Sequence, residues 1–111
     1  MLQKYKNTHA SPRSFNNHYG VPLSLSNLNL NHRFGVFEVG MSKTGEIDHL
    51  SKMINPHLAI ITNIAEAHIE NFKNIKGIAK AKSEILNSIR NDGTVILNRD
   101  DAFYSYLAKK A

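Results

Sequence analysis

The sequence predicts an α/β fold, a mostly parallel sheet with flanking helices. Strand-like and helix-like segments alternate along its 111 residues, which is the element order of a parallel sheet with crossover helices. The strand-like runs are apolar at nearly every position, as expected where helices cover both faces of a strand. Each run ends in polar residues, and ligands bind beyond the carboxyl ends of the strands in such sheets. These three observations make the strand ends the place to look for a site.

The N-terminal segment is polar and is expected to lead into a helix. Ser11 and Pro12 mark a turn within residues 1–14. Pro22 suits the first turn of a helix, because the ring of proline fixes a helical φ and the first turn needs no N–H donor there. The apolar residues assigned to this helix are Leu23, Leu25, Leu28 and Leu30.

A pair of amides precedes this helix, and a strand follows it. Asn16 and Asn17 are either helix caps or ligand-binding amides, and the residues alone leave both readings open. The strand is expected over residues 33–39, where the sequence RFGVFEV is almost continuously apolar. Glu38 lies at the C-terminal end of this strand, followed by Gly40. A carboxylate in that position is a candidate ligand-binding group.

Two further strands and two short helices complete the predicted alternation. A helix is expected over residues 45–54, and a second apolar strand over residues 57–64. A third strand is expected over residues 94–97, and a last helix over residues 102–110.

The longest predicted helix begins near residue 73 or 74 and stops at the turn signal Asn91-Asp92-Gly93. Its apolar stripe follows helical spacing and consists of Ile75, Ile78, Lys82, Ile85 and Ile89. Lys82 stands out, because a buried ammonium is unfavourable unless it is paired, neutralised or reached by water. Either the lysine extends its charge to solvent along the apolar face, or it is held near a phosphate, a carboxylate or a metal.

Composition limits the class of protein. The net charge is +5 and the pI about 9.6, which fits an anionic partner such as a nucleotide. The basic residues are scattered rather than interleaved with aromatic residues, which argues against a nucleic-acid-binding protein. Without cysteine there is no disulfide framework or thiolate metal site. No run approaches the length of a membrane span, and the N-terminus has no signal-peptide core, so the cytoplasm is the expected location.

The polar residues near the strand ends suggest phosphate chemistry. Glu38 and His68 supply a carboxylate oxygen and an imidazole, a pair that suits Mg²⁺ or Mn²⁺ better than a closed zinc site. Lys82 is expected at the same end of the sheet, and a metal with a lysine is the equipment of phosphoryl transfer. The phosphate-binding motif GxxxxGK[ST] does not occur in the sequence. The residues alone therefore indicate a phosphate- or nucleotide-handling α/β domain.

Several segments resemble the central ATPase domain of the Mur ligase family. In chain order they are NNHYGVPLSL (16–25), EVGMSKTGEI (38–47), ITNIAEAHIENF (61–72), GIAKAKSEIL (77–86) and VILNRDD (95–101). The first of these resembles in particular the branch of the family that adds D-alanyl-D-alanine. The resemblance covers nearly the whole chain from about His9 onward, and it implies a P-loop-type parallel fold.

The resemblance implies an ATP-dependent ligase of peptidoglycan precursor synthesis. Such enzymes use ATP with Mg²⁺ to convert a carboxylate of a UDP-N-acetylmuramoyl peptide into an acyl phosphate. An amine, here the dipeptide D-Ala-D-Ala, then attacks to form an amide. ATP as substrate, Mg²⁺ as cofactor, and these two substrates as partners are what the family resemblance implies for this chain.

The same resemblance suggests roles for individual residues. Glu38 matches the glutamate that binds Mg²⁺ near the phosphates, and His68 matches the catalytic-site histidine that serves a second Mg²⁺. Lys82 matches the lysine that is carbamylated in this family, a change that turns the cation into an anion able to support Mg²⁺.

Three further positions are expected at the nucleotide. Asn98 matches the asparagine at the adenine pocket. Asp100 or Asp101, of which Asp101 is preferred, is placed near the nucleotide by analogy. Asn17 is the candidate nucleotide-binding amide of the N-terminal pair.

The chain also departs from the family pattern. The Gly-rich GKT loop, the N-terminal UDP-binding domain and the closing C-terminal domain have no counterpart in these 111 residues. Arg13-Ser14 stands where Gly-Asn is expected before the asparagine pair. We therefore expect residues 1–111 to be part of the central ATP-binding domain and to be inactive alone, since the amides of the missing loop hold the triphosphate.

Three hypotheses remain. The chain is a piece of a Mur ligase, either a gene remnant or one part of a split enzyme completed by complementary fragments. Alternatively it is a non-enzymatic module that has retained the fold and binds a nucleotide or a protein. A basic nucleic-acid-binding domain ranks last and predicts steeply salt-dependent binding.

Overall fold

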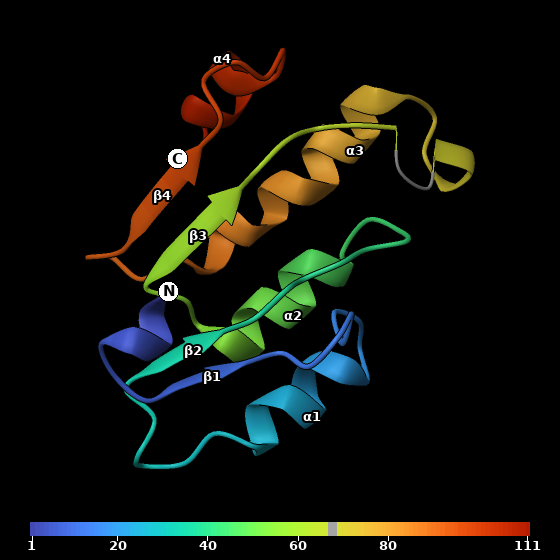
Figure 1. Cartoon of the computed structure of the whole chain (residues 1–111). Coiled ribbons are helices and arrows are strands. Elements are labelled where there is room, and N and C mark those ends of the chain that lie inside the picture. Colours follow the sequence, from blue (N-terminus) through green and yellow to red (C-terminus); the bar gives the residue numbers. More distant parts are fainter. Residues whose placement is uncertain (67–68) are drawn as a thin grey trace. The chain divides into compact units, whose positions relative to one another are not determined.

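The computed structural model describes residues 1–66 and 69–111 and divides into two compact units. The N-terminal unit comprises Met1–Gly40 and the C-terminal unit Met41–Ala111. Each unit contains one pair of parallel strands, with helix between the two strands in the chain (Figure 1). Parallel pairing and alternating helices confirm the predicted α/β class.

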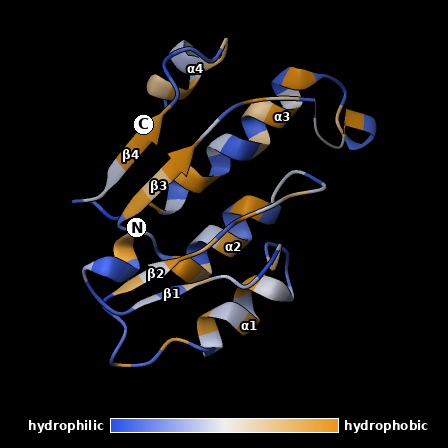
Figure 2. Cartoon of the chain, in the orientation of Figure 1, coloured by the Kyte–Doolittle hydropathy of each residue, from blue (hydrophilic) through white to orange (hydrophobic). Residues whose placement is uncertain are grey.

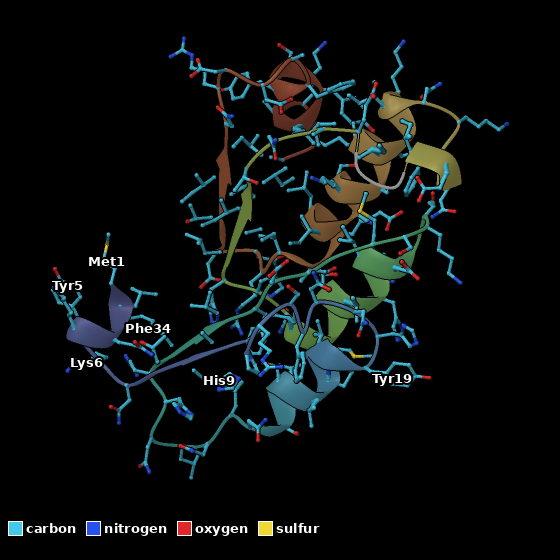
Figure 3. All side chains as sticks on the ribbon, turned by 45° about the vertical axis from the view of Figure 1, so that its right-hand side comes forward. Met1, Tyr5, Lys6, His9, Tyr19 and Phe34 are labelled. Carbon is cyan, nitrogen blue, oxygen red and sulfur yellow. The ribbon has the colours of Figure 1, made fainter. Side chains whose placement is uncertain are left out.

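The N-terminal unit is a β-α-β segment. Its elements are η1 (Leu2–Lys4), β1 (Thr8–Ala10), α1 (Gly20–Ser26) and β2 (Phe34–Val36). The strands pair so that Thr8 lies opposite Phe34. His9 lies on β1 (Figure 3). Its Nε2 lies 2.9 Å from the Oγ of the fully buried Ser24 on α1. This polar contact ties the helix to the strand.

Three predictions for this unit need correction. The strand expected over residues 33–39 is limited to β2. The polar N-terminal stretch contains β1, which was not predicted. The helix ends at Ser26, because the side chains of Ser26 and Asn27 both donate to the carbonyl of Leu23 and so compete with further helical bonds. Leu30, which was assigned to the helix, is fully exposed.

The C-terminal unit contains the remaining elements. They are α2 (Glu46–Ile54), β3 (Leu58–Ile61), η2 (Ile69–Asn71), α3 (Ile75–Lys82), η3 (Ser83–Ser88), β4 (Thr94–Leu97) and α4 (Tyr104–Ala108). Strands β3 and β4 pair in parallel, with Leu58 opposite Thr94. Helix α2 packs against α3 and η3. The apolar core of the unit includes Ile47, Leu50, Ala59, Ile61, Ile64, Phe72, Ile78, Ala79, Ala81 and Leu107.

Only one face of β3 is covered, contrary to the expectation that both faces would be. Ala59 and Ile61 are buried, whereas Leu58 and Ile60 are 49% and 54% exposed. Both strands of this pair are coloured as hydrophobic over much of their length (Figure 2). The strand expected over residues 57–64 is also shorter than predicted. The apolar outer face therefore remains accessible in this chain.

The long predicted helix changes character after Lys82. It begins as predicted, because the Oδ1 of Asn74 accepts the N–H of Gly77 and caps α3. From Ser83 to Ser88 the chain continues as a 3-10 helix. The Oγ of Ser83 donates to the carbonyl of Lys80 at 2.7 Å, a local bond that competes with regular α-helical pairing. The predicted apolar stripe is thus split between two kinds of helix.

The other predicted elements of this unit are present. Helix α2 starts after Gly45, whose φ of +92° suits glycine, and ends before Asn55, also in the left-handed region. Strand β4 has the predicted bounds, and α4 is shorter than residues 102–110. Among the described residues, no helix is long and apolar enough to cross a membrane.

Candidate functional site

Glu38 follows β2 and has a partner from the asparagine pair. Its Oε1 accepts a hydrogen bond from the Nδ2 of Asn16 at 2.8 Å, and its side chain is exposed. The backbone N–H of Gly40 donates to the carbonyl of Asn16 at 2.7 Å. A Cβ at position 40 would lie 2.9 Å from the Cγ of Asn16, so glycine allows this close approach. Asn16, considered with Asn17 as a helix cap or a ligand-binding amide, is therefore the partner of Glu38, a contact that the sequence did not indicate.

Asn17 has the role of a helix cap in this structure. Its Oδ1 accepts the backbone N–H groups of Tyr19 at 3.1 Å and Gly20 at 2.9 Å, at the start of α1. The capping interpretation weighed for the asparagine pair is thus confirmed for Asn17. A contact between Asn17 and a nucleotide stays a prediction.

Lys82 is the last residue of α3 and reaches the end of β3. Its Nζ donates to the backbone carbonyl of Asn63 at 2.8 Å, and its side chain is partly exposed. The charge of this lysine is thus satisfied by a carbonyl while remaining accessible to solvent, which explains how it is tolerated in the apolar stripe. Lys82 lies at the carboxyl end of a strand, as predicted.

The segment after β4 is built around two polar side chains. The Oδ1 of Asn98 accepts the N–H of Asp100 at 3.0 Å, forming a turn directly after the strand. Asp101 uses both carboxylate oxygens: Oδ2 accepts the N–H of Ile64 at 2.6 Å, and Oδ1 accepts the N–H of Phe103 at 2.7 Å. Asp101 thereby joins the ends of β3 and β4.

The predicted site residues fall into separate groups. Glu38, with Asn16 and Asn17, belongs to the N-terminal unit, and Lys82, Asn98 and Asp101 belong to the C-terminal unit. His68 lies outside the described residues. Among residues 1–66 and 69–111 there is no group of three metal-ligating side chains. The meeting of Glu38, His68 and Lys82 at one metal centre therefore stays a prediction.

A hollow in the N-terminal unit lies away from these residues. It has a volume of about 190 Å³ and is lined by Gln3, Lys6, Asn7, Thr8 and His32. The lining includes no carboxylate and no predicted site residue. We therefore place the candidate site at the strand ends and not in this hollow.

Comparison with known proteins identifies the family. The Mur ligase middle domain matches residues 1–111. The chain belongs to the Mur ligase family. It is 40% identical over 109 residues to the UDP-N-acetylmuramoyl-tripeptide–D-alanyl-D-alanine ligase of Buchnera aphidicola, a match that covers 98% of this chain and 24% of that enzyme. The enzyme of the same name from Borreliella burgdorferi is 38% identical, covering 100% of this chain and 23% of the relative.

Solved structures of Mur ligases agree with the sequence comparison. The MurF of Acinetobacter baumannii matches with a TM-score of 0.96 and 37% identity, over 99% of this chain and 24% of that one. The MurF of Thermotoga maritima, crystallised in complex with ADP, matches with a TM-score of 0.88 and 27% identity, over 98% of this chain and 26% of that one. The chain spans about a quarter of the length of these relatives. The predicted Mur ligase resemblance, including its D-Ala-D-Ala-adding branch, is confirmed.

Proposed function

We propose that this chain is a middle-domain segment of an ATP-dependent Mur ligase that adds D-Ala-D-Ala to a UDP-N-acetylmuramoyl tripeptide. The observation that carries this proposal is the match of almost the entire chain to enzymes bearing that name. ATP and UDP-linked precursors are cytoplasmic metabolites, so we place the protein in the cytoplasm. Because the chain spans about a quarter of its relatives, the remaining parts of the ligase, on the same or on complementary polypeptides, are required partners.

The proposed reaction has two steps. A carboxylate oxygen of the tripeptide attacks the γ-phosphorus of ATP, and the bond from that phosphorus to the bridging oxygen breaks to release ADP. The amine nitrogen of D-Ala-D-Ala then attacks the acyl carbon, phosphate leaves, and the nitrogen loses a proton. This segment supplies side chains that bind and orient the groups involved, which is the main contribution of proteins to phosphoryl transfer.

Glu38 fits the role of a magnesium ligand. Carboxylate oxygens are preferred by Mg²⁺, and this carboxylate is exposed, follows a parallel strand, and is oriented by the hydrogen bond from Asn16. His68 is the second proposed ligand. Bound Mg²⁺ would neutralise the charge that develops on the phosphates. Asn16 holds the Glu38 carboxylate in one orientation.

Lys82 fits the role of a carbamylated lysine. Carbon dioxide would add to the neutral amine, forming a bond between nitrogen and carbon while the nitrogen releases a proton to water. The side chain is partly exposed, so CO₂ can reach it, and its nitrogen is held at the end of β3 by the Asn63 carbonyl. The product is a negatively charged carbamate at the position where the unmodified Lys82 side chain carries a positive charge.

The nucleotide is proposed to contact the segment through amides. Asn98, just beyond β4, is the proposed adenine contact, and Asn17 is a second candidate. Each uses its Oδ1 for a backbone turn or cap, which leaves the side-chain NH₂ group as the donor toward a ligand. Asp101 was predicted near the nucleotide, but both of its oxygens already accept backbone N–H groups.

A chimeric enzyme tests the proposed function. Residues 1–111 would replace the matching quarter of the Acinetobacter baumannii MurF, and amide formation would be measured with ATP, the UDP-linked tripeptide and D-Ala-D-Ala. We expect the chimera to turn over and the 111-residue chain alone to be inactive. A Lys82→Met chimera serves as the control, since methionine keeps the apolar stem and removes the amine. A folded chimera without ligase activity would contradict the proposal.

A further inference from the structure

One peptide group in the C-terminal unit is held between two side chains of opposite charge. The carbonyl oxygen of Asn63 accepts a hydrogen bond from Lys82 Nζ at 2.8 Å. The N–H of Ile64 donates to Asp101 Oδ2 at 2.6 Å. This oxygen and this N–H belong to the same peptide bond. Lys82 and Asp101 therefore act on the two ends of one dipole just beyond β3.

The charges and the peptide dipole reinforce one another. A hydrogen bond at one end of a polar group polarises the group and strengthens the bond at the other end, and bonds to charged side chains are stronger than neutral ones. Asp101 is itself anchored, because its second oxygen accepts the N–H of Phe103 and its backbone carbonyl accepts the N–H of Tyr104. Ile64 is buried. The peptide is consequently fixed in orientation.

We propose that Asp101 is a positioning residue for Lys82 and acts through the Asn63–Ile64 peptide. This inference rests on the proposed function, in which Lys82 becomes a carbamate. A carbamate nitrogen is planar and retains a single N–H. When that N–H donates to the Asn63 oxygen, the direction of the new carboxylate is set. Without Asp101, the peptide can rotate and the carboxylate loses its fixed direction.

The geometry favours this role over a nucleotide contact. Both oxygens of Asp101 are occupied at 2.6 Å and 2.7 Å by backbone N–H groups. A direct contact with a nucleotide would compete with these bonds. A positioning role leaves them intact, and it predicts an effect on the rate of the chemical step and not on nucleotide affinity.

Kinetics of the chimera separate the two roles. Asp101→Asn removes the charge of the side chain. Asp101→Ser removes the charge as well, and its hydroxyl oxygen can still accept the Phe103 N–H at the start of α4. We expect both to lower kcat about tenfold, as for loss of one charge-assisted hydrogen bond, with the KM for ATP unchanged. Asp92→Asn, the same charge change at an exposed site, should leave both constants unchanged. The proposal would be overturned if the variants raised the KM for ATP with kcat unchanged. It would also be overturned if the Asp101→Ser chimera had the same kcat and KM as the parent chimera.

A chemical measurement on the 111-residue chain is independent of ligase activity. Trace acetylation followed by peptide mass spectrometry would compare the labelling of Lys82 with that of the exposed Lys80 on the same helix. In Asp101→Ser, the Asn63 carbonyl should hold the Lys82 amine less firmly, so the amine should react more readily. The labelling ratio of Lys82 to Lys80 should then rise several-fold, whereas Asp92→Asn should not change it. An unchanged ratio in Asp101→Ser disproves the coupling. An inactive parent chimera with a raised ratio would reject the proposed function alone.

Discussion

At the residue scale, Asp48 is a side chain whose ionisation responds clearly to its surroundings. It accepts hydrogen bonds from Lys52 at 2.6 Å and from Asn87 at 3.0 Å. These bonds, that of Lys52 first, lower the pKa of Asp48 below the ordinary value of 3.8. Because the folded state favours the ionised carboxylate, its contribution to stability is present above pH 3.8 and is lost as the pH falls through the lower folded pKa.

Removing the principal partner should reduce this pH dependence. In Lys52→Met we expect the 111-residue chain to be slightly less stable than the parent near neutral pH. The difference should shrink as the pH falls through the lowered folded pKa of Asp48, because the carboxyl is then protonated in both proteins. Urea unfolding at a series of pH values measures it, with Lys76→Met on the exposed side of α3 as the charge-matched control. A pH-independent difference would mean that Lys52 stabilises by packing alone.

Residue positions were easier to predict than residue partners. Glu38 and Lys82 lie near strand ends as the sequence indicated, because strand and helix periodicity are local properties. The partner of Glu38 is Asn16, 22 residues away. The side-chain partners of Asp101 are two backbone N–H groups, which carry no sequence signal. Such contacts depend on how the chain folds back, so the capping and ligand-binding interpretations of the asparagine pair could not be separated beforehand.

At the element scale, the N-terminus of α2 is capped by a distant carboxylate. Both oxygens of Glu84, on η3, accept the N–H of Gly45 at 2.9 Å and 3.0 Å, and Oε2 also accepts the N–H of Asp48 at 3.3 Å. A negative charge at this end of a helix is favourable, because the helix dipole and the unpaired N–H groups are both directed toward it. Glu84 thus ties the segment that follows Lys82 to α2.

Truncating this cap should destabilise the C-terminal unit. We expect Glu84→Ala to lower the free energy of unfolding by about 1–2 kcal/mol, the usual effect of losing a helix cap. Glu84→Gln should recover part of this loss, since its amide oxygen still accepts one N–H. Thermal and urea unfolding provide the measurement, and Asp92→Ala provides the control at an exposed carboxylate. Equal stability of Glu84→Ala and the control would show that water replaces the cap.

Element boundaries were predictable where the sequence contains residues that favour turns or helix ends, such as glycine and asparagine. Strand β4 follows Asn91-Asp92-Gly93 and has the predicted bounds, and α2 lies between glycine and Asn55 in left-handed conformations. Strand β1 has three residues, Thr8–Ala10, in a polar stretch, and forms because β2 pairs with it. The break after Lys82 depends on a serine hydroxyl bond. Neither feature is accompanied by a periodic pattern of apolar residues from which it could be predicted.

At the scale of the whole molecule, the β3–β4 pair leaves apolar strand surface exposed. Leu58, Ile60 and Ile96 on the β3–β4 pair are 49%, 54% and 46% exposed. Apolar strands that are open to solvent associate readily. The apolar runs in the sequence predicted these strands. They also predicted helices on both faces of the sheet, because continuous apolar runs are typical of strands inside complete α/β sheets.

The 111-residue chain should therefore self-associate, and a charge on the open face should reduce this. We expect Ile60→Lys to shift the chain toward monomer while changing the free energy of unfolding by less than about 1 kcal/mol, because the side chain is already exposed. Ile61→Lys, on the buried face at 6% exposure, should instead unfold the C-terminal unit, since it buries an unpaired ammonium. Sedimentation velocity over a concentration series, with Asn91→Lys as the control for added charge, distinguishes these outcomes. If the parent chain is monomeric at all concentrations, or if Asn91→Lys disperses it as well as Ile60→Lys does, the open β3–β4 face is not the site of association.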